Sequence, residues 1–160
     1  MNKYFGGYLV LSAVFLLIFL LVIAPPFLDK YGRENLLGLD YLVFSGYCHQ
    51  LDYRSLHLWG VKLAVCARCT GVYLGFLIGT LAYPFFRKLD SGEKPPVWLI
   101  AVAVFPMVLD GGTQLIGLRE SNNMLRLFTG LLFGACIAPY LVFTMSRLVE
   151  EVAVKFRRSD

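Results

Sequence analysis

The chain has 160 residues, a length that suits one domain. Hydrophobic residues make up 58% of it, charged residues make up 16%, and the formal net charge is +4. A water-soluble domain of this size has a high ratio of surface to volume and needs more polar surface than this composition supplies. The composition therefore excludes an ordinary soluble domain and indicates an integral membrane protein.

Four long apolar runs predict four transmembrane helices. Residues 8–28, 70–86 and 127–146 carry no charge, and residues 97–118 carry only Asp110. The hydrocarbon core of a bilayer takes roughly 20 helical residues to cross, and a backbone in lipid must satisfy its hydrogen bonds internally. The predicted fold is all-α, a polytopic bundle of about four transmembrane helices in a single domain over residues 1–160. The predicted helices are 8–28, 69–86, 97–116 and 124–147, with a polar loop at 29–68.

The basic residues predict the orientation of the bundle. The first run is too long for the apolar core of a signal peptide and lacks a small-residue cleavage pattern, so we expect it to be retained as a helix. With four helices, both ends of the chain and the loop at 87–96 share one side. Basic residues in the short flanks on that side are Lys3, Arg87, Lys88, Lys94, Arg147, Lys155, Arg157 and Arg158. By the positive-inside rule, both termini are predicted to lie in the cytoplasm, with the protein in the cell membrane.

The net charge needs no nucleic acid to explain it. The basic residues flank the apolar segments, where they anchor helix ends at anionic lipid, so membrane lipids are the expected partners. The loop at 29–68 is then expected to face outward. Residues 36–47 within it are largely apolar and carry aromatic side chains, which is typical of a segment that lies at the membrane interface or re-enters it.

Three of the four cysteines and both histidines lie between residues 48 and 69. Cys66 and Cys69 form a Cys-x-x-Cys pair directly before an apolar helix, a spacing that places both sulfurs on one side of a tight turn. The helix amino end and the adjacent Arg68 favour the thiolate form. With Cys48 and His49, the pair would make a tetrahedral Cys₃His site suited to zinc. This requires a bent backbone at Cys48, and His57 is the spare ligand.

Two other interpretations of the cysteines stay open. Cys66 and Cys69 could be the reactive pair of a membrane thiol–disulfide oxidoreductase, with Cys48 as the exchanging thiol, because an extracytoplasmic face tolerates disulfides. The cysteines could also form a plain structural disulfide or be inert. Cys136 lies in the middle of the last predicted helix and is expected to be a small buried apolar residue.

Polar groups near the last two helices form a second candidate site. Asp110 shares a helix face with Gln114 if the helix continues through the glycines at 111 and 112, or lies at the water boundary if the glycines end it. Pairing of Asp110 with Arg119 or Arg126 would build a polar pocket, although Arg126 could equally be an anchor at the interface. Such a pocket would suit a small transporter or a binder of lipid headgroups. Ser121 or Asn122 is expected to cap the last helix.

Glycines recur at every fourth residue in two helices. The positions are Gly71, Gly75 and Gly79 in the second predicted helix and Gly130 and Gly134 in the last. Such stripes let helices approach closely. The sequence leaves open whether the contact lies within the chain or joins protomers of a homo-oligomer.

The polar motifs together resemble a known family. They are Cys48-His49-Gln50, Arg54-Ser55, the run from Cys66 to Gly75, the run from Asp110 to Gln114, Arg119, Ser121, Asn123 and Arg126. Over roughly residues 41–134 the chain is similar to predicted membrane proteins of domain of unknown function 2085, found in bacteria and archaea. The resemblance implies that the polar residues act as one set. That set is Arg54, Ser55, Arg68, Asp110, Gln114, Arg119, Ser121, Asn123 and Arg126. The family has no established activity to carry over.

Overall fold

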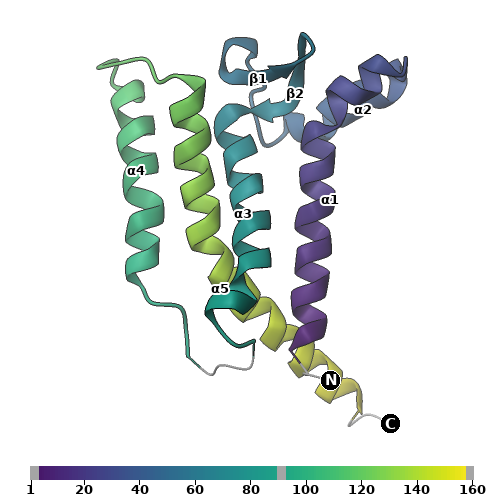
Figure 1. The fold of residues 1–160 in the computed structure, drawn as a ribbon, viewed down its shortest axis with the longest axis vertical. Coiled ribbons are helices and arrows are strands. Elements are labelled where there is room, and N and C mark those ends of the chain that lie inside the picture. Colours follow the sequence, from purple (N-terminus) through teal and green to yellow (C-terminus); the bar gives the residue numbers. More distant parts are fainter. Residues whose placement is uncertain (1–3, 90–92, 158–160) are drawn as a thin grey trace.

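The structure is a computed structural model that describes residues 4–89 and 93–157 (Figure 1). Helices dominate the described residues, and a two-stranded hairpin lies at one end of the bundle. In chain order the elements are α1 (Phe5–Lys30), α2 (Glu34–Ser45), the 3₁₀ turn η1 (Asp52–Arg54), β1 (Ser55–Leu58), β2 (Val61–Cys66), α3 (Ala67–Phe86), α4 (Trp98–Leu115) and α5 (Asn123–Arg157).

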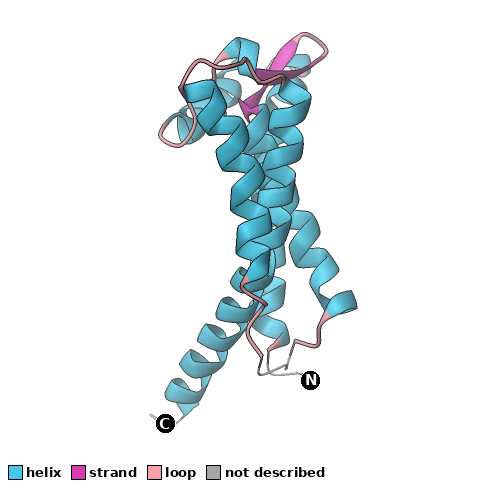
Figure 2. Cartoon of the chain, turned by 90° about the vertical axis from the view of Figure 1, so that its left-hand side faces the viewer, coloured by secondary structure: helices cyan, strands magenta, loops and turns pink. Residues whose placement is uncertain are grey.

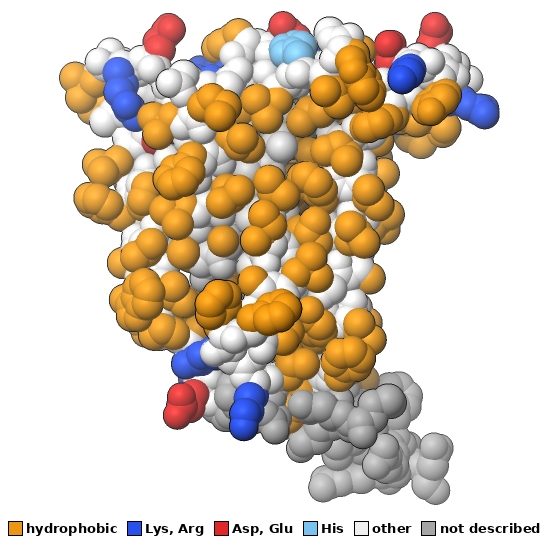
Figure 3. Space-filling view, viewed as in Figure 1, with side chains coloured by type: hydrophobic (Ala, Val, Ile, Leu, Met, Phe, Trp, Pro, Cys, Tyr) orange, Lys and Arg blue, Asp and Glu red, His pale blue; other side chains and the backbone are white. Residues whose placement is uncertain are grey.

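Four of the helices are long and apolar enough to cross a membrane: α1, α3, α4 and the part of α5 at Asn123–Val152. In the space-filling view, apolar side chains cover the middle of the molecule and charged side chains gather toward its two ends (Figure 3). This distribution matches an apolar belt in lipid between two wet ends. The predicted fold class, a polytopic all-α membrane protein with about four spanning helices, is confirmed.

The last helix extends beyond its predicted end. The prediction placed that end at residue 147, whereas α5 continues through Arg157. Residues 148–157 contain neither glycine nor proline and are mostly good helix formers, so nothing in the sequence stops the helix once it leaves the apolar layer. In two perpendicular views, α1 begins and α5 ends at the end of the bundle opposite the hairpin (Figures 1 and 2).

The glycine stripes of α3 and α5 face each other within the chain. A Cβ atom at Gly71 would lie 2.2 Å from the Leu127 carbonyl oxygen, and one at Gly130 would lie 2.2 Å from the Arg68 carbonyl oxygen. No side chain fits at these distances, so glycine lets the two backbones touch. The close approach brings the first turns of α3 and α5 together at the hairpin end of the bundle.

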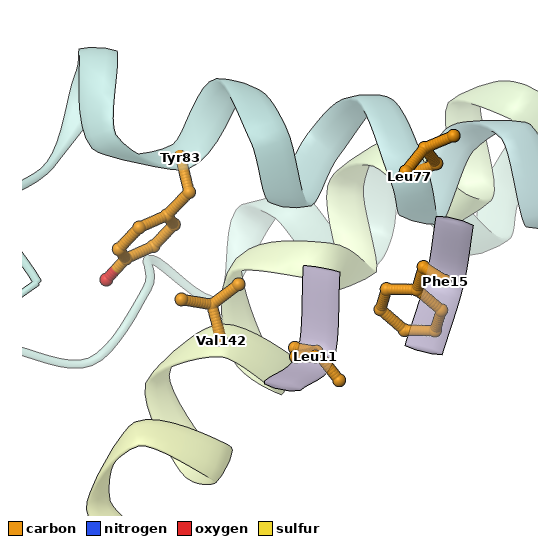
Figure 4. Close-up of a cluster of buried hydrophobic side chains, with 5 residues drawn as sticks. All are labelled: Leu11, Phe15, Leu77, Tyr83 and Val142. Atoms are coloured by element: carbon orange, nitrogen blue, oxygen red, sulfur yellow. The ribbon is translucent and has the colours of Figure 1, made fainter. Parts of the chain in front are cut away.

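Helix α1 packs across this pair. Leu11 and Phe15 of α1 meet Leu77 and Tyr83 of α3 and Val142 of α5 in a buried apolar cluster (Figure 4). Phe15 also stacks on Phe76, with ring centroids 5.1 Å apart. These contacts hold α1 in place through its apolar side chains.

The predicted polar loop at 29–68 is itself structured. It contains α2, which lies at the same end of the bundle as the hairpin, and the strands β1 and β2 (Figure 1). Trp59 and Gly60 connect the strands with φ angles of 54° and 83°, as a tight two-residue hairpin turn requires. Trp59 packs edge-on against Phe27 at 5.3 Å and lies under the Lys30 ammonium group at 4.8 Å. The hairpin is therefore tied to the end of α1, and β2 leads directly into α3.

Candidate metal centre and adjoining polar site

Three cysteine sulfurs meet at the hairpin end of the bundle. The Sγ atoms of Cys48, Cys66 and Cys69 all lie within 4.8 Å of one another. Cys48 is buried, whereas Cys66 and Cys69 are partly exposed. All three are free cysteines in the structure. The arrangement is a compact trio of soft donor atoms, open on one side.

Local structure explains the position of each sulfur. Cys66 is the last residue of β2 and the N-cap of α3, and Cys69 lies in the first turn of that helix. Cys48 follows α2 and packs with Val22, Phe44 and Val65 in a buried apolar cluster. The Cys-x-x-Cys pair thus lies at a helix amino end, where the sequence predicts it.

Gln50 fixes the loop that carries Cys48. Its side-chain amide donates hydrogen bonds to the carbonyl oxygens of Tyr41 and Ala64, both at 2.8 Å, and so ties this loop to α2 and β2. Its φ angle is 51°, in the left-handed region. A bend at Cys48 was the condition for His49 to join the cysteines as a ligand, and the left-handed residue lies two positions later. No pattern in the sequence marked Gln50 as the residue that positions the loop.

Hydrogen bonds converge on the Cys48 sulfur. The backbone N–H groups of Cys66 and Gln50 donate to it at 3.2 and 3.5 Å. The thiols of Cys66 and Cys69, together with these N–H groups, lower the pKa of Cys48 far below its ordinary value, although burial opposes the shift. Donors of this kind stabilise a thiolate, the form that a metal or a disulfide-exchange reaction needs.

The two histidines lie apart from the sulfur trio. His49 is exposed and lines the cavity beside the thiols. His57 Nε2 lies 3.1 Å from Asp52 Oδ1 in an exposed pair on the hairpin. Among the described residues, the group of donor atoms close enough to share an ion contains the three cysteines and no histidine. Cys136 is buried in α5 and is not a member of the group.

A cavity of about 200 Å³ opens next to the sulfurs. Its walls come from the Cys48 loop, the first turns of α3 and α5, and the end of α4. The cysteines of the trio line it together with His49, Arg54, Arg68, Met107, Gln114 and Arg126. The sulfur trio and several of the predicted polar residues therefore share one space.

Asp110 is the charged centre of the polar residues. It is 2% exposed, and α4 continues past it through Leu115, so the glycines at 111 and 112 do not end the helix. Its carboxylate pairs with Arg68 of α3 and, at 2.9 Å, with Arg119. Of the two pairings that the sequence suggested, the one with Arg119 forms and the one with Arg126 does not. The unpredicted partner, Arg68, lies beside the Cys-x-x-Cys pair.

A second network joins the start of α5 to the hairpin. Asn123 donates to the carbonyl oxygens of Tyr53 and Ser55 at 3.3 and 3.2 Å, and its own carbonyl oxygen accepts from Arg126 at 2.9 Å. The buried Ser55 hydroxyl donates to the Leu51 carbonyl oxygen at 2.9 Å. These bonds attach the hairpin to the last helix.

One hydrogen bond identifies the residue that caps the amino end of α5. The Asn122 side-chain oxygen accepts from the Leu125 backbone N–H at 2.7 Å, which makes Asn122 the capping residue rather than Ser121. Ser121 is buried beside it. Arg126, 5% exposed, lies inside the fold rather than reaching to the membrane surface.

Comparison with known proteins places the chain among membrane proteins. The family model described as "Predicted membrane protein (DUF2085)" matches residues 48–140. An uncharacterized protein of Methanocaldococcus jannaschii is 41% identical over 147 residues, which cover 89% of this chain and 92% of the relative. An uncharacterized protein of Methanothermobacter thermautotrophicus is 41% identical over 95 residues, 59% of this chain and 84% of the relative. No solved structure matches significantly.

Proposed function

The chain belongs to the DUF2085 family of predicted membrane proteins, and from that premise we propose that it binds a thiophilic divalent metal ion, zinc, on Cys48, Cys66 and Cys69. The observation that carries the proposal is the approach of the three sulfurs to within 4.8 Å of one another. Three thiolates at about 2.3 Å from a zinc ion in tetrahedral geometry lie about 3.8 Å apart. Small side-chain rotations bring the trio to that spacing.

The fourth ligand position faces the cavity. His49 lines that cavity and is exposed, so a side-chain rotation and a shift of the loop would bring its imidazole toward the ion. Alternatively, a water molecule or a small ligand takes the position, which is the arrangement of zinc sites that act on a substrate. When bound, zinc supplies a Lewis acid next to a polar cavity and holds the hairpin loop onto α3.

Metal analysis tests the proposal directly. Protein that is purified in detergent under reducing conditions, without any chelator, is expected to contain one zinc ion per chain. Cys48→Ser, Cys66→Ser and Cys69→Ser should each lose most of that metal, and the matched control Cys136→Ser should retain it because Cys136 lies outside the trio. If the wild-type protein contains no stoichiometric metal, the proposed zinc site is excluded.

A thiol–disulfide oxidoreductase is the second candidate. The same sulfur spacing supports it, because Cys66 and Cys69 are partly exposed and Cys48 is close enough to exchange with either. This activity predicts reversible oxidation of Cys66 and Cys69 by an external oxidant and a mixed disulfide trapped in Cys69→Ser. Thiol labelling that is identical under reducing and oxidising conditions would exclude it.

The basic residues in the short flanks support one orientation of the bundle. We propose that the protein lies in the plasma membrane with both termini cytoplasmic and the sulfur trio outside. Arg87, Lys88, Lys94 and Arg147 lie at the end opposite the trio and support this orientation through the positive-inside rule. Lys3 and Arg158 lie outside the described residues. The test is to fuse a fluorescent protein that becomes fluorescent only in the cytoplasm to the carboxyl terminus. Cells that express this fusion are expected to fluoresce.

A further inference from the structure

A second cavity adjoins the one beside the thiols. It has a volume of about 340 Å³ and is lined mainly by polar side chains from η1, the α4–α5 loop and the first turn of α5. Arg54, Gln114 and Arg126 line both cavities and so form the border between them. Two guanidinium groups are thus directed at one polar space at the end of the bundle.

The charges in this space do not cancel. Asp110 is paired with Arg68 and Arg119. Among residues 4–89 and 93–157, Arg54 and Arg126 take part in no ion pair. Glu120 also lines the second cavity, but it is exposed and, among the described residues, joins no ion pair. The cavity therefore holds two guanidinium groups that form no ion pair with a carboxylate of the described residues.

Arg126 is the more informative of the two. It is 95% buried, since its relative exposure is 5%, and its Nε atom has no hydrogen-bond partner. Among the described residues, Asn123 is the one that accepts a hydrogen bond from the guanidinium group, at 2.9 Å. Burying a charge without a counter-charge is strongly unfavourable. Arg126 also lies in the first turn of α5, where the helix dipole disfavours a cation and favours an anion.

Arg54 supplies the second guanidinium group of this cavity. Its Nε atom is buried and likewise has no hydrogen-bond partner, and its guanidinium group lies 5.1 Å from the Tyr53 ring. Arg54 belongs to η1, outside the spanning helices, while Arg126 belongs to α5. The Asn123 bridge between α5 and the hairpin keeps these two elements together.

We propose that Arg54 and Arg126 bind the phosphate group of an anionic ligand in this cavity, with Gln114 as an additional polar contact. Guanidinium groups present planar pairs of N–H donors that match phosphate oxygens, and two of them supply the charge that a phosphate requires. The cavity lies at the end of the apolar belt, a level that both lipid headgroups and dissolved phosphate reach. The assignment holds whether or not the sulfur trio carries a metal ion.

Two binding measurements test the assignment and distinguish the sources of the phosphate. In a maltoside detergent, which contains no phosphate, the protein is titrated with inorganic phosphate by calorimetry, with acetate as the comparison anion. In a parallel series, native mass spectrometry counts bound phosphatidylglycerol, with diacylglycerol as the comparison lipid. Binding of inorganic phosphate identifies a soluble ligand, and binding of phosphatidylglycerol alone identifies a lipid headgroup.

Matched variants assign the site. Arg54→Gln is expected to weaken binding of the phosphate ligand at least tenfold, and Arg126→Gln should do the same while circular dichroism reports an intact helical fold. Arg33→Gln removes an exposed arginine near the same end of the bundle and should leave binding unchanged. Three results would overturn the proposal. The wild-type protein could bind neither inorganic phosphate nor phosphatidylglycerol, or it could bind acetate and diacylglycerol as tightly as the phosphate ligands. Alternatively, Arg54→Gln could bind the phosphate ligand as tightly as Arg33→Gln does.

Discussion

The ion pair between Arg68 and Asp110 joins α3 to α4 beside the sulfur trio. Asp110 is 2% exposed, and its other oxygen accepts from Arg119 at 2.9 Å. A single buried carboxylate therefore fixes two arginines from separate parts of the chain. It also keeps Arg68 turned toward α4, although its neighbour Cys69 belongs to the sulfur trio.

Asp110→Asn is predicted to destabilise the protein by about 1–3 kcal/mol, because it leaves the partly buried Arg68 guanidinium group without its counter-charge, while the exposed Arg119 is compensated by water. The measurement is thermal unfolding in detergent, followed by circular dichroism. Glu93→Gln is the control: it removes an exposed carboxylate 3.8 Å from Arg87, and its effect should stay below about 1 kcal/mol. Equal losses in the two variants would contradict the central role of Asp110.

Gly71→Ala is predicted to destabilise the bundle by about 1–3 kcal/mol, since the added methyl group would lie 2.2 Å from the Leu127 carbonyl oxygen and push α3 away from α5. Gly112→Ala is the matched change in α4, where nothing lies within 4 Å of the new Cβ atom. That variant should be as stable as the wild type or slightly more stable, because alanine favours helix. Unfolding temperatures of both variants in one detergent check the contrast.

Gln50→Asn is predicted to lower zinc affinity by 10- to 100-fold without removing a ligand. Asparagine tolerates the left-handed backbone at this position, but its side chain is one methylene shorter and cannot reach both the Tyr41 and Ala64 carbonyl oxygens. Competition with a chromophoric chelator gives the affinity. Gln114→Asn, the same chemical change at another residue that lines the cavity, should bind zinc like the wild type.

The buried carboxyl group of Asp40 is expected to make the free energy of unfolding depend on pH. It is 7% exposed, its Oδ2 atom has no hydrogen-bond partner, and burial raises its pKa to about 6. Because the folded-state pKa lies above the unfolded value of 3.8, the stability that Asp40 contributes is present below pH 4 and is lost as the pH rises through 6. The full loss is about 3 kcal/mol.

Asp40→Asn should therefore be more stable than the wild type at pH 7.5, and the difference should shrink at pH 4.5. Unfolding temperatures at the two pH values provide the test. Asp29→Asn changes an exposed acid at the end of α1, and its small effect should be similar at both. A difference for Asp40→Asn that is the same at both pH values would show that its carboxyl group titrates normally.

Several features could be read from the chain without its structure. The apolar runs predicted four spanning helices because lipid forces each long apolar segment to satisfy its own backbone. The Cys66-x-x-Cys69 spacing placed two sulfurs at the start of a helix because four residues make a single local turn. The glycine stripes predicted a close helix contact because only small residues permit one.

Other features depend on contacts between distant residues. The hairpin was missed because its strands are short and are stabilised by packing of Trp59 on Phe27 and Lys30. Arg68 was not foreseen as the partner of Asp110, because the two residues are 42 positions apart and meet only once α3 and α4 are placed. The position of His57 on β1, where it pairs with Asp52, likewise depends on the tertiary structure.

The amino-acid sequence by itself determined that the chain is a helical membrane protein and which of its segments span the membrane. It also determined that cysteines and polar residues gather near particular helix ends. These properties follow from local composition and periodicity, which act over a few turns. The tertiary structure decided which donors share a space, which arginines are neutralised by Asp110, and which two remain unpaired. Those outcomes depend in part on how closely the glycine faces of α3 and α5 approach, because that contact brings Arg68, Cys69 and Arg126 to the same end of the bundle.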